Sequence, residues 1–156
     1  MLGFYHRNLC VNLAYMERVN LTKEQKEKII ASMRSSGAMV GYLFGSYARG
    51  TANSRSDIDV AVAFPREMPI EPQENRVEDI RNNLEKIFGA DKVDVLNVGA
   101  VKNPLLFYTA TLGEGTILFA DDISLKNSIA MRALRDFEDT EHLRKIQSES
   151  VKKLFA

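Results

Sequence analysis

Apolar positions along the chain change their spacing from one segment to the next, and these changes predict alternating helices and strands. Residues 8–19 have the apolar spacing of a short helix. Thr22 is a typical N-cap for a second helix, which we expect to end at Gly37. The apolar run at residues 39–44 lies between two glycines and predicts a buried strand.

Residues 57–64 alternate between two faces of a predicted strand, because side chains at i and i+2 point the same way. The first face is apolar and is expected to join the core through Ile58, Val60, Val62 and Phe64. The second face consists of Asp57, Asp59, Ala61 and Ala63. Since this face is acidic at its start and small thereafter, we expect it to leave open space above the strand.

The remaining segments repeat the alternation. Prolines mark a loop at residues 65–72, and a helix with apolar residues at helical spacing then continues to Gly89. From residue 124 onward the pattern is helical, with a break near residues 139–140. Between these segments we predict a strand, a helix and a second strand at residues 92–98, 104–113 and 116–120. The sum predicts an α+β (mixed α/β) fold, in which a small mixed β-sheet is flanked by helices.

A chain of 156 residues suits one domain with its own core. We divide it into an N-terminal helical extension at 1–21, a core at 22–123 and a C-terminal helical segment at 124–156. The last segment has an apolar face made of Leu143, Ile146, Val151 and Leu154. We expect this face to pack on the chain's own core, to pair in a homodimer, or to cover another protein.

Composition narrows the function classes. Lysine plus arginine and aspartate plus glutamate number 21 each, so no overall basic field favours stable binding of a nucleic-acid polymer. Cys10 is the only cysteine, which excludes an intrachain disulfide, and His6 and His142 are too far apart in sequence to suggest a metal site. Because the sequence lacks a membrane-spanning apolar stretch and a secretory signal, we expect a cytoplasmic protein.

Two aspartates stand in alternate register at the start of the second predicted strand. Asp57 and Asp59 therefore point the same way, with α-carbons about 6–7 Å apart. Their carboxylates can converge on a hard cation such as Mg²⁺, which prefers oxygen ligands. The alternative is a pair of solvated acids on an exposed strand face.

Gly45 and Ser46 directly follow the first predicted strand. Glycine lets a phosphate approach the backbone closely, and serine offers a hydroxyl and an amide. A simple turn is the alternative for this pair taken alone. Arg49 is placed to contact phosphates, and Arg55 is a second candidate whose alternative is a solvated loop residue.

Asp94 supplies a third acid, flanked by two valines in the third predicted strand. If this strand neighbours the one that begins with Asp57 and Asp59, three carboxylates meet at one edge of the sheet. Such a set fits phosphoryl or nucleotidyl transfer assisted by two metal ions. The alternative is an acid at the sheet edge that faces water.

The spacing of these residues is similar to that of a known superfamily. Gly45-Ser46, ten intervening positions and Asp57-x-Asp59 match the G-S-x10-D-x-D signature of the DNA polymerase beta-like nucleotidyltransferases. The stretch YLFGSYARGTANSRSDIDVAV most closely resembles the minimal nucleotidyltransferases, the MNT antitoxins of HEPN/MNT toxin–antitoxin pairs. The strand KVDVLNV resembles their third-carboxylate strand. The likeness covers about residues 22–155.

The resemblance implies a nucleotidyltransferase fold for the core and a definite chemistry. Asp57 and Asp59 would bind two Mg²⁺ ions, and Asp94 would bind the catalytic one and help to deprotonate the acceptor. Gly45 and Ser46 would hold the triphosphate of ATP. The implied reaction transfers AMP to a tyrosine of a cognate HEPN toxin and neutralises its RNase activity. One departure is Asn97, where relatives often carry a second acid.

Two other functions remain open at this point. A binding-only antitoxin would mask its toxin without catalysis. A nucleotidyltransferase of a different kind would act on a small molecule such as an aminoglycoside, although enzymes of that kind carry an added substrate domain. The nucleotide preference, the number of AMP units transferred and the choice between homo-oligomer and hetero-oligomer are not determined by the sequence.

Overall fold

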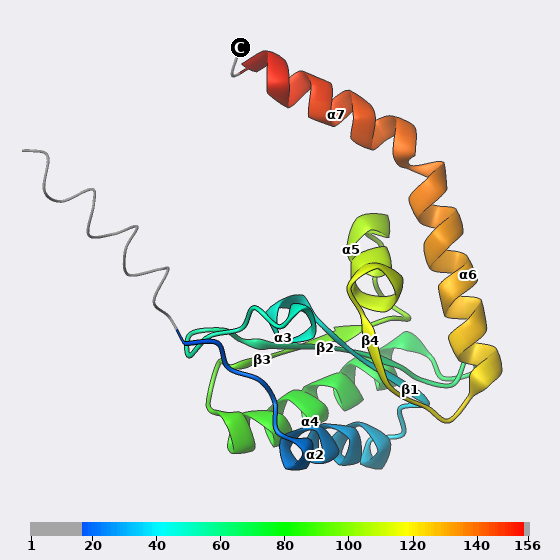
Figure 1. The fold of residues 1–156 in the computed structure, drawn as a ribbon. Coiled ribbons are helices and arrows are strands. Elements are labelled where there is room, and N and C mark those ends of the chain that lie inside the picture. Colours follow the sequence, from blue (N-terminus) through cyan, green and yellow to red (C-terminus); the bar gives the residue numbers. More distant parts are fainter. Residues whose placement is uncertain (1–16, 155–156) are drawn as a thin grey trace, which may run out of the picture.

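A computed structural model describes the backbone of residues 17–154 and the side chains of residues 17–152. A mixed sheet lies between two layers of helices (Figure 1), so the predicted α+β fold is confirmed. In chain order the elements are α2 (Lys23–Ser35), β1 (Val40–Phe44), α3 (Gly45–Arg49), β2 (Ile58–Ala63), α4 (Ile70–Phe88), β3 (Val93–Asn97), α5 (Pro104–Tyr108), the π-helical turn η1 (Thr109–Gly113), β4 (Thr116–Ala120), α6 (Ile123–Asp139) and α7 (Glu141–Leu154).

The sheet has the strand order β3-β2-β1-β4. Strand β1 is antiparallel to both β2 and β4, whereas β2 and β3 are parallel. Figure 1 shows α2 and α4 on one face of the sheet, with α5, η1 and α6 on the other. The end of β1 therefore lies beside the start of β2, and the start of β3 lies on the other side of β2.

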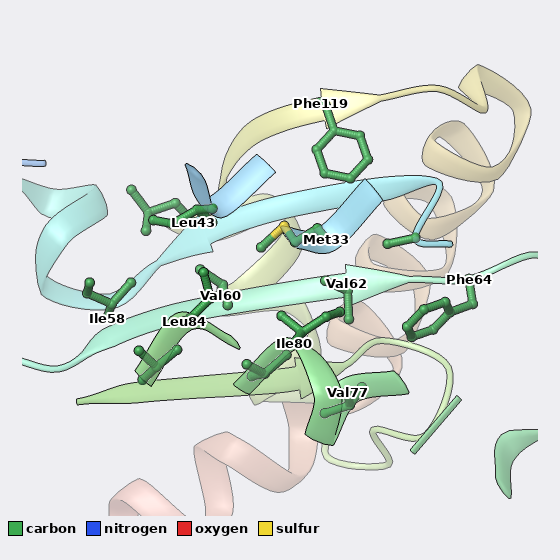
Figure 2. Close-up of a cluster of buried hydrophobic side chains, with 14 residues drawn as sticks. Met33, Leu43, Ile58, Val60, Val62, Phe64, Val77, Ile80, Leu84 and Phe119 are labelled. Carbon is green, nitrogen blue, oxygen red and sulfur yellow. The ribbon is translucent and has the colours of Figure 1, made fainter. Parts of the chain in front are cut away.

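One hydrophobic core fills the space between the sheet and the helices α2 and α4 (Figure 2). The apolar face predicted for β2 belongs to it, since Ile58, Val60, Val62 and Phe64 are all buried in this cluster. The helices contribute buried residues at helical spacing, namely Ile29, Met33, Val77, Ile80 and Leu84. Because Ile58 is anchored in this core, the core also fixes the backbone of its neighbours Asp57 and Asp59.

The opposite face of β2 is covered, and the prediction of open space along all of it was wrong. Ala61 and Ala63 are buried in a second cluster with Tyr42 of β1 and Phe107 of α5. Small alanines leave room for these large rings, so the space is filled by neighbours instead of solvent. Burial raises the pKa of Tyr42 to about 12, so its hydroxyl stays neutral. Only the start of this face, at Asp57 and Asp59, is left uncovered by the cluster.

Helix α6 contributes to the same second core through Leu125, Ile129 and Ala133. Helix α7 projects beyond the sheet and its covering helices (Figure 1). The helical segment is interrupted at Thr140, between α6 and α7, close to the position that the sequence predicts. On α7, Leu143 is 58% exposed and Val151 is 52% exposed, and Ile146 is also exposed. The side chain of Leu154 lies outside the described residues.

Several predicted boundaries moved for local reasons. Helix α4 begins at Ile70, inside the loop predicted up to residue 72, because Pro72 falls in the first turn, where the missing N–H has no partner to lose. The Asn103 side chain accepts hydrogen bonds from the backbone N–H groups of Leu105 and Leu106, which explains the start of α5 at Pro104. The last turn after α5 is π-helical, which the sequence pattern did not indicate.

The structure describes only part of the N-terminal extension predicted at residues 1–21. Most of the helix predicted at residues 8–19 lies outside the described residues, as do His6 and Cys10. Residues 17–22 have no regular secondary structure, and the Val19 N–H donates to the Ala52 carbonyl at 2.9 Å. His142 is exposed on α7. No helix among residues 17–154 is both long and apolar enough to cross a membrane.

The N-terminus of α2 carries the predicted cap, and its contribution is measurable. The Thr22 hydroxyl accepts from the Gln25 N–H at 3.1 Å, and the Gln25 side chain accepts from the Thr22 N–H at 2.9 Å. Thr22→Ala is therefore expected to lower the free energy of unfolding by about 1 kcal/mol in urea denaturation. Lys26→Ala, on an exposed face of the same helix, is the control and should change it by less than about 0.5 kcal/mol. Equal effects of the two substitutions would rule out the capping box as a source of stability.

Candidate active site

Acidic side chains from two parallel strands lie side by side at one end of the sheet. Asp59 of β2 is the register partner of Asp94 of β3, on strands about 4.8 Å apart. Residues directly opposite each other in a sheet have side chains on the same face. Asp57 stands two positions before Asp59, directly before β2 begins. The structure thus brings the three predicted acids together where β2 and β3 begin.

The electrostatics of Asp59 report this proximity. Its carboxyl is half-buried, and burial is the largest cause that raises its pKa above the ordinary value. The negative charges of Asp94 and then Asp57 raise the pKa further, whereas the charge of Arg49 lowers it. Three carboxylates and one guanidinium therefore interact here, and the mutual repulsion of the acids favours a cation between them.

The Gly45-Ser46 corner lies next to Asp59, with Gly45 packed against its carboxylate. Gly45 follows Phe44, which is the register partner of Asp59 across the β1–β2 ladder. Its φ of +68° is in the region that favours glycine, and a Cβ placed on it would collide with the Asp59 carboxylate. Ser46 is half-buried in the first turn of α3. Glycine is thus required here by both backbone conformation and space.

The two predicted arginines differ in their placement. Arg49 ends α3, and its Nη1 lies 2.5 Å from the Glu114 Oε2, with both side chains partly exposed. Its charge also lowers the pKa of Asp59, so it lies near the acids. Arg55 is in the exposed loop before β2, and its recorded contacts involve only the backbone: its N–H donates to Asn53, and its carbonyl accepts from Lys92. The structure therefore places Arg49 at the site and Arg55 in the adjacent loop.

Sequence reasoning missed two charged residues at this edge. The Lys92 Nζ lies 3.5 Å from the Asp57 Oδ1 and donates to the Arg55 carbonyl at 3.3 Å. The sequence did contain an indication for Lys92. It stands two residues before Asp94, so both side chains lie on the same side of an extended chain. Glu114, the partner of Arg49, comes from the turn after η1, and no sequence pattern connects it to the site.

A small cavity opens beside the acids. Its volume is about 310 Å³, and its lining combines Asp59 and Asp94 with the apolar side chains of Phe44, Leu96 and Leu106. This size is at the lower end of the range for small-ligand pockets. Carboxylates next to apolar walls suit a ligand that has both a charged, metal-bound part and a planar or apolar part.

The donor set fits a hard divalent cation in its chemistry. All three acids offer oxygen. Burial, followed by the negative charges of Asp94 and Asp57, raises the pKa of Asp59, and a cation would compensate those charges. Among residues 17–152, no three His, Cys, Asp or Glu side chains are already grouped to hold one metal ion, and Asp57 is directed at Lys92 instead. The carboxylate metal set of Asp57, Asp59 and Asp94 therefore stays a prediction.

Asn97 lies on the same strand as Asp94 but outside the site. It is buried, its Nδ2 donates to Glu74 of α4 at 2.7 Å, and its Oδ1 accepts from the Gly99 N–H at 3.0 Å. It lies at an odd spacing from Asp94, so its side chain is on the opposite face of β3. An acid at this position would not extend the site at Asp94, and its absence removes nothing from it.

Comparison with known proteins gives a family match. The model of the family described as "Polymerase beta, Nucleotidyltransferase" matches residues 24–124, which include all the candidate site residues. No curated protein sequence matches the chain significantly.

Several solved structures have a similar fold. One is a crystal structure of a toxin–antitoxin with AMP-PNP, with a TM-score of 0.60 and 21% identity over 84% of this chain and 98% of that chain. A second is a tri-AMPylated Shewanella oneidensis HEPN toxin in complex with MNT antitoxin, with a TM-score of 0.56 and 18% identity over 87% of this chain and 100% of that chain. A third, the toxin–antitoxin MntA-HepT, has a TM-score of 0.56 and 18% identity over 86% of this chain and 100% of that chain. At these identities the likeness establishes the fold.

Proposed function

Because the chain belongs to the polymerase beta nucleotidyltransferase family, we propose that it is an antitoxin enzyme that transfers AMP from ATP to a tyrosine of a HEPN toxin. The observation that carries the proposal is the pairing of Asp59 with Asp94 on parallel strands, directly beside Gly45. Structures with this fold include a toxin–antitoxin with AMP-PNP and an AMPylated HEPN toxin bound to its MNT antitoxin, which supports ATP and a HEPN protein as the two substrates.

Each residue at the site has a distinct role in this proposal. Asp57 and Asp59 would hold both divalent cations, and Asp94 would be a third ligand of the catalytic one. Gly45 and Ser46 hold the triphosphate through backbone N–H groups and the serine hydroxyl. Arg49 contributes positive charge near the phosphates. Mg²⁺, when bound, supplies Lewis-acid stabilisation of the phosphates and eases ionisation of the attacking hydroxyl.

The transfer step needs a proton acceptor as well as a nucleotide site. The tyrosine oxygen forms a new bond to the α-phosphorus, while the bond from that phosphorus to the bridging oxygen of pyrophosphate breaks. Pyrophosphate leaves with the electron pair, and the tyrosine proton is transferred to Asp94. Asp94 is suited to this role because it is exposed at the edge of the sheet, where an acceptor from another protein can reach it.

A second candidate is a binding-only antitoxin, and the exposed surface of α7 favours it. Leu143, Ile146 and Val151 are exposed on a helix that projects from the body of the protein (Figure 1). These spacings place apolar side chains where a partner can cover them. An enzyme that acts on a protein substrate also needs a docking surface, so the exposed face of α7 is consistent with both proposals. The two proposals differ in whether neutralisation requires the acids.

The test is intact-mass spectrometry of a HEPN protein encoded beside this chain, after incubation with the chain, ATP and Mg²⁺. We expect added AMP on a tyrosine and loss of the toxin's RNase activity. The double variant Asp57→Asn/Asp59→Asn should bind the toxin and add no AMP, whereas Asp79→Asn, on an exposed part of α4, should behave as the parent. Neutralisation by the double variant would support the binding-only antitoxin. Labelling of an aminoglycoside in place of the toxin would point to a small-molecule acceptor.

The ion pair between Arg49 and Glu114 gives a separate prediction, because it competes with the phosphates for the guanidinium. Glu114→Gln removes the competing charge and is expected to tighten binding of a non-hydrolysable ATP analogue with Mg²⁺ about two- to fivefold by calorimetry. Glu78→Gln breaks a comparable surface pair with Arg81 on α4 and should leave the affinity unchanged. Weaker binding by Glu114→Gln would mean that Glu114 supports the nucleotide site.

A further inference from the structure

A second cavity lies at the other end of β2, away from the acids. It has a volume of about 380 Å³ and lies between the end of β2, the loop that follows it, the start of α4, the residues after β3 and one side of α6. Asp59 and the cavity-lining Ala63 are four residues apart on one strand, a separation of about 13 Å. We propose that this cavity binds a small organic carboxylate that has an apolar body and a hydrogen-bond donor.

The first reason is a buried acceptor with no partner. Gln73, at 5% exposure, lines the cavity, and its Nε2 donates to the Met68 carbonyl at 2.6 Å. Since a carbonyl oxygen only accepts, the amide nitrogen must face Met68, and this fixes the position of the side-chain oxygen. Among the described residues the Gln73 Oε1 has no hydrogen-bond partner. An unpaired buried acceptor destabilises the folded protein, and a donor on a ligand would remove this penalty.

Gly99 lies directly beside this oxygen and has no side chain to cover it. It also lines the cavity, and a Cβ placed on it would lie only 2.6 Å from the Gln73 Oε1. Its own N–H is already donated to the Asn97 Oδ1 at 3.0 Å, so it does not serve Gln73. A residue of the cavity wall therefore carries a buried acceptor that has no partner among the described residues.

The second reason is the charge of the lining. Arg66 and Arg132 line the cavity, and no acidic residue does. Arg132 is partly engaged, with its Nε 3.3 Å from the Asp136 Oδ2 and its Nη2 donating to the Val101 carbonyl. Arg66 donates from Nη2 to the Ser128 hydroxyl at 2.6 Å and forms no ion pair within residues 17–152. Its planar fork matches a carboxylate, and one carboxylate balances one guanidinium.

The rest of the lining is apolar and accounts for the body of the ligand. Helix α6 presents Leu125 and Ile129 one turn apart. The loop after β2 adds Phe64 and Met68, and the start of α4 adds Ile70. Pockets of this kind, largely apolar with a few fixed polar groups, are typical of small-molecule sites. No predicted active-site residue lines the cavity, so this proposal is independent of nucleotidyl transfer.

The test uses three related probes and calorimetry on the full chain. Indole-3-acetate has the carboxylate, the apolar ring and an N–H donor; 1-methylindole-3-acetate lacks the donor, and indole-3-acetamide lacks the charge. We expect indole-3-acetate to bind with one site per chain, and each of the other two to bind about tenfold more weakly. Equal affinity for the three probes, or no binding of indole-3-acetate at millimolar concentration, would overturn the proposal.

Variants place the binding in this cavity. Arg66→Gln should weaken indole-3-acetate about tenfold, whereas Arg135→Gln, on an exposed part of α6 outside the lining, should not. Gln73→Met should remove the advantage of indole-3-acetate over its N-methyl derivative. If Gln73→Met does not fold, Gly99→Ala serves the same purpose, because its Cβ displaces the Gln73 oxygen. A full N–H advantage in a folded variant of either kind would mean that Gln73 does not contact the ligand.

Discussion

Replacing Asp59 by asparagine is expected to slow nucleotidyl transfer by about a thousandfold or more and at the same time to raise the melting temperature. The loss of rate follows because the substitution removes the carboxylate that lies opposite Asp94 and in contact with Gly45. The gain in stability follows because Asp59 is half-buried and repelled by Asp94 and Asp57, so its ionised form destabilises the fold. Transfer is followed by AMP incorporation and stability by thermal unfolding of the metal-free protein.

The gain in stability should depend on pH in a defined direction. The pKa of Asp59 is raised in the folded protein, so the folded state binds more protons than the unfolded state between the two pKa values. The penalty is therefore absent below the unfolded value, near 3.9, and grows as pH rises through the folded value. The advantage of Asp59→Asn should be full at pH 7 and should shrink as the pH falls toward 4. An Asp59→Asn protein that is less stable than the parent at pH 7 would contradict the repulsion.

Replacing Gly45 by alanine is expected to cost both stability and activity. The backbone at Gly45 has φ +68°, which strains any other residue by about 1–2 kcal/mol, and the new Cβ would collide with the Asp59 carboxylate. Because this collision displaces Asp59 and closes the approach of a phosphate to the backbone, we expect transfer to fall about a hundredfold. Steady-state AMP transfer and urea denaturation measure the two effects.

Gly50 provides a matched control for Gly45. It has nearly the same backbone conformation, φ +70°, at the other end of α3, and a Cβ placed on it would meet no atom within 4 Å. Gly50→Ala should therefore show the backbone strain alone and retain most of the activity. If the two alanine variants lost activity equally, the contact between Gly45 and Asp59 would have no part in catalysis.

The strands and their buried faces were predictable from the sequence because local alternation determines them. The positions of Ile58, Val60, Val62 and Phe64 follow from a period of two, and Thr22 with Gln25 follows from local hydrogen bonding. The cover over Ala61 and Ala63 was not predictable, because it depends on where α5 docks. A small residue on a strand is consistent with either open space or a large neighbour from a distant segment.

The candidate site shows the same division between local and long-range information. The spacing of Asp57 and Asp59 and their separation from Gly45 in the sequence are local features. They were enough to predict a site at the start of one strand. Lys92 lies within reach of Asp57 because β3 is parallel to β2 in a particular register, and Glu114 meets Arg49 across a separation of 65 residues in sequence. Pairings of this kind depend on tertiary packing, so a single sequence does not reveal them.

The most direct test of the central claim, that Asp57, Asp59 and Asp94 together hold divalent cations at the nucleotide, is equilibrium binding of Mn²⁺. Electron paramagnetic resonance measures free Mn²⁺ in the presence of a non-hydrolysable ATP analogue. The parent chain should bind two ions, and Asp94→Asn and Asp59→Asn should each weaken binding of at least one ion about tenfold or more. Asp94→Asn with the same stoichiometry and affinity as the parent would contradict the three-carboxylate site.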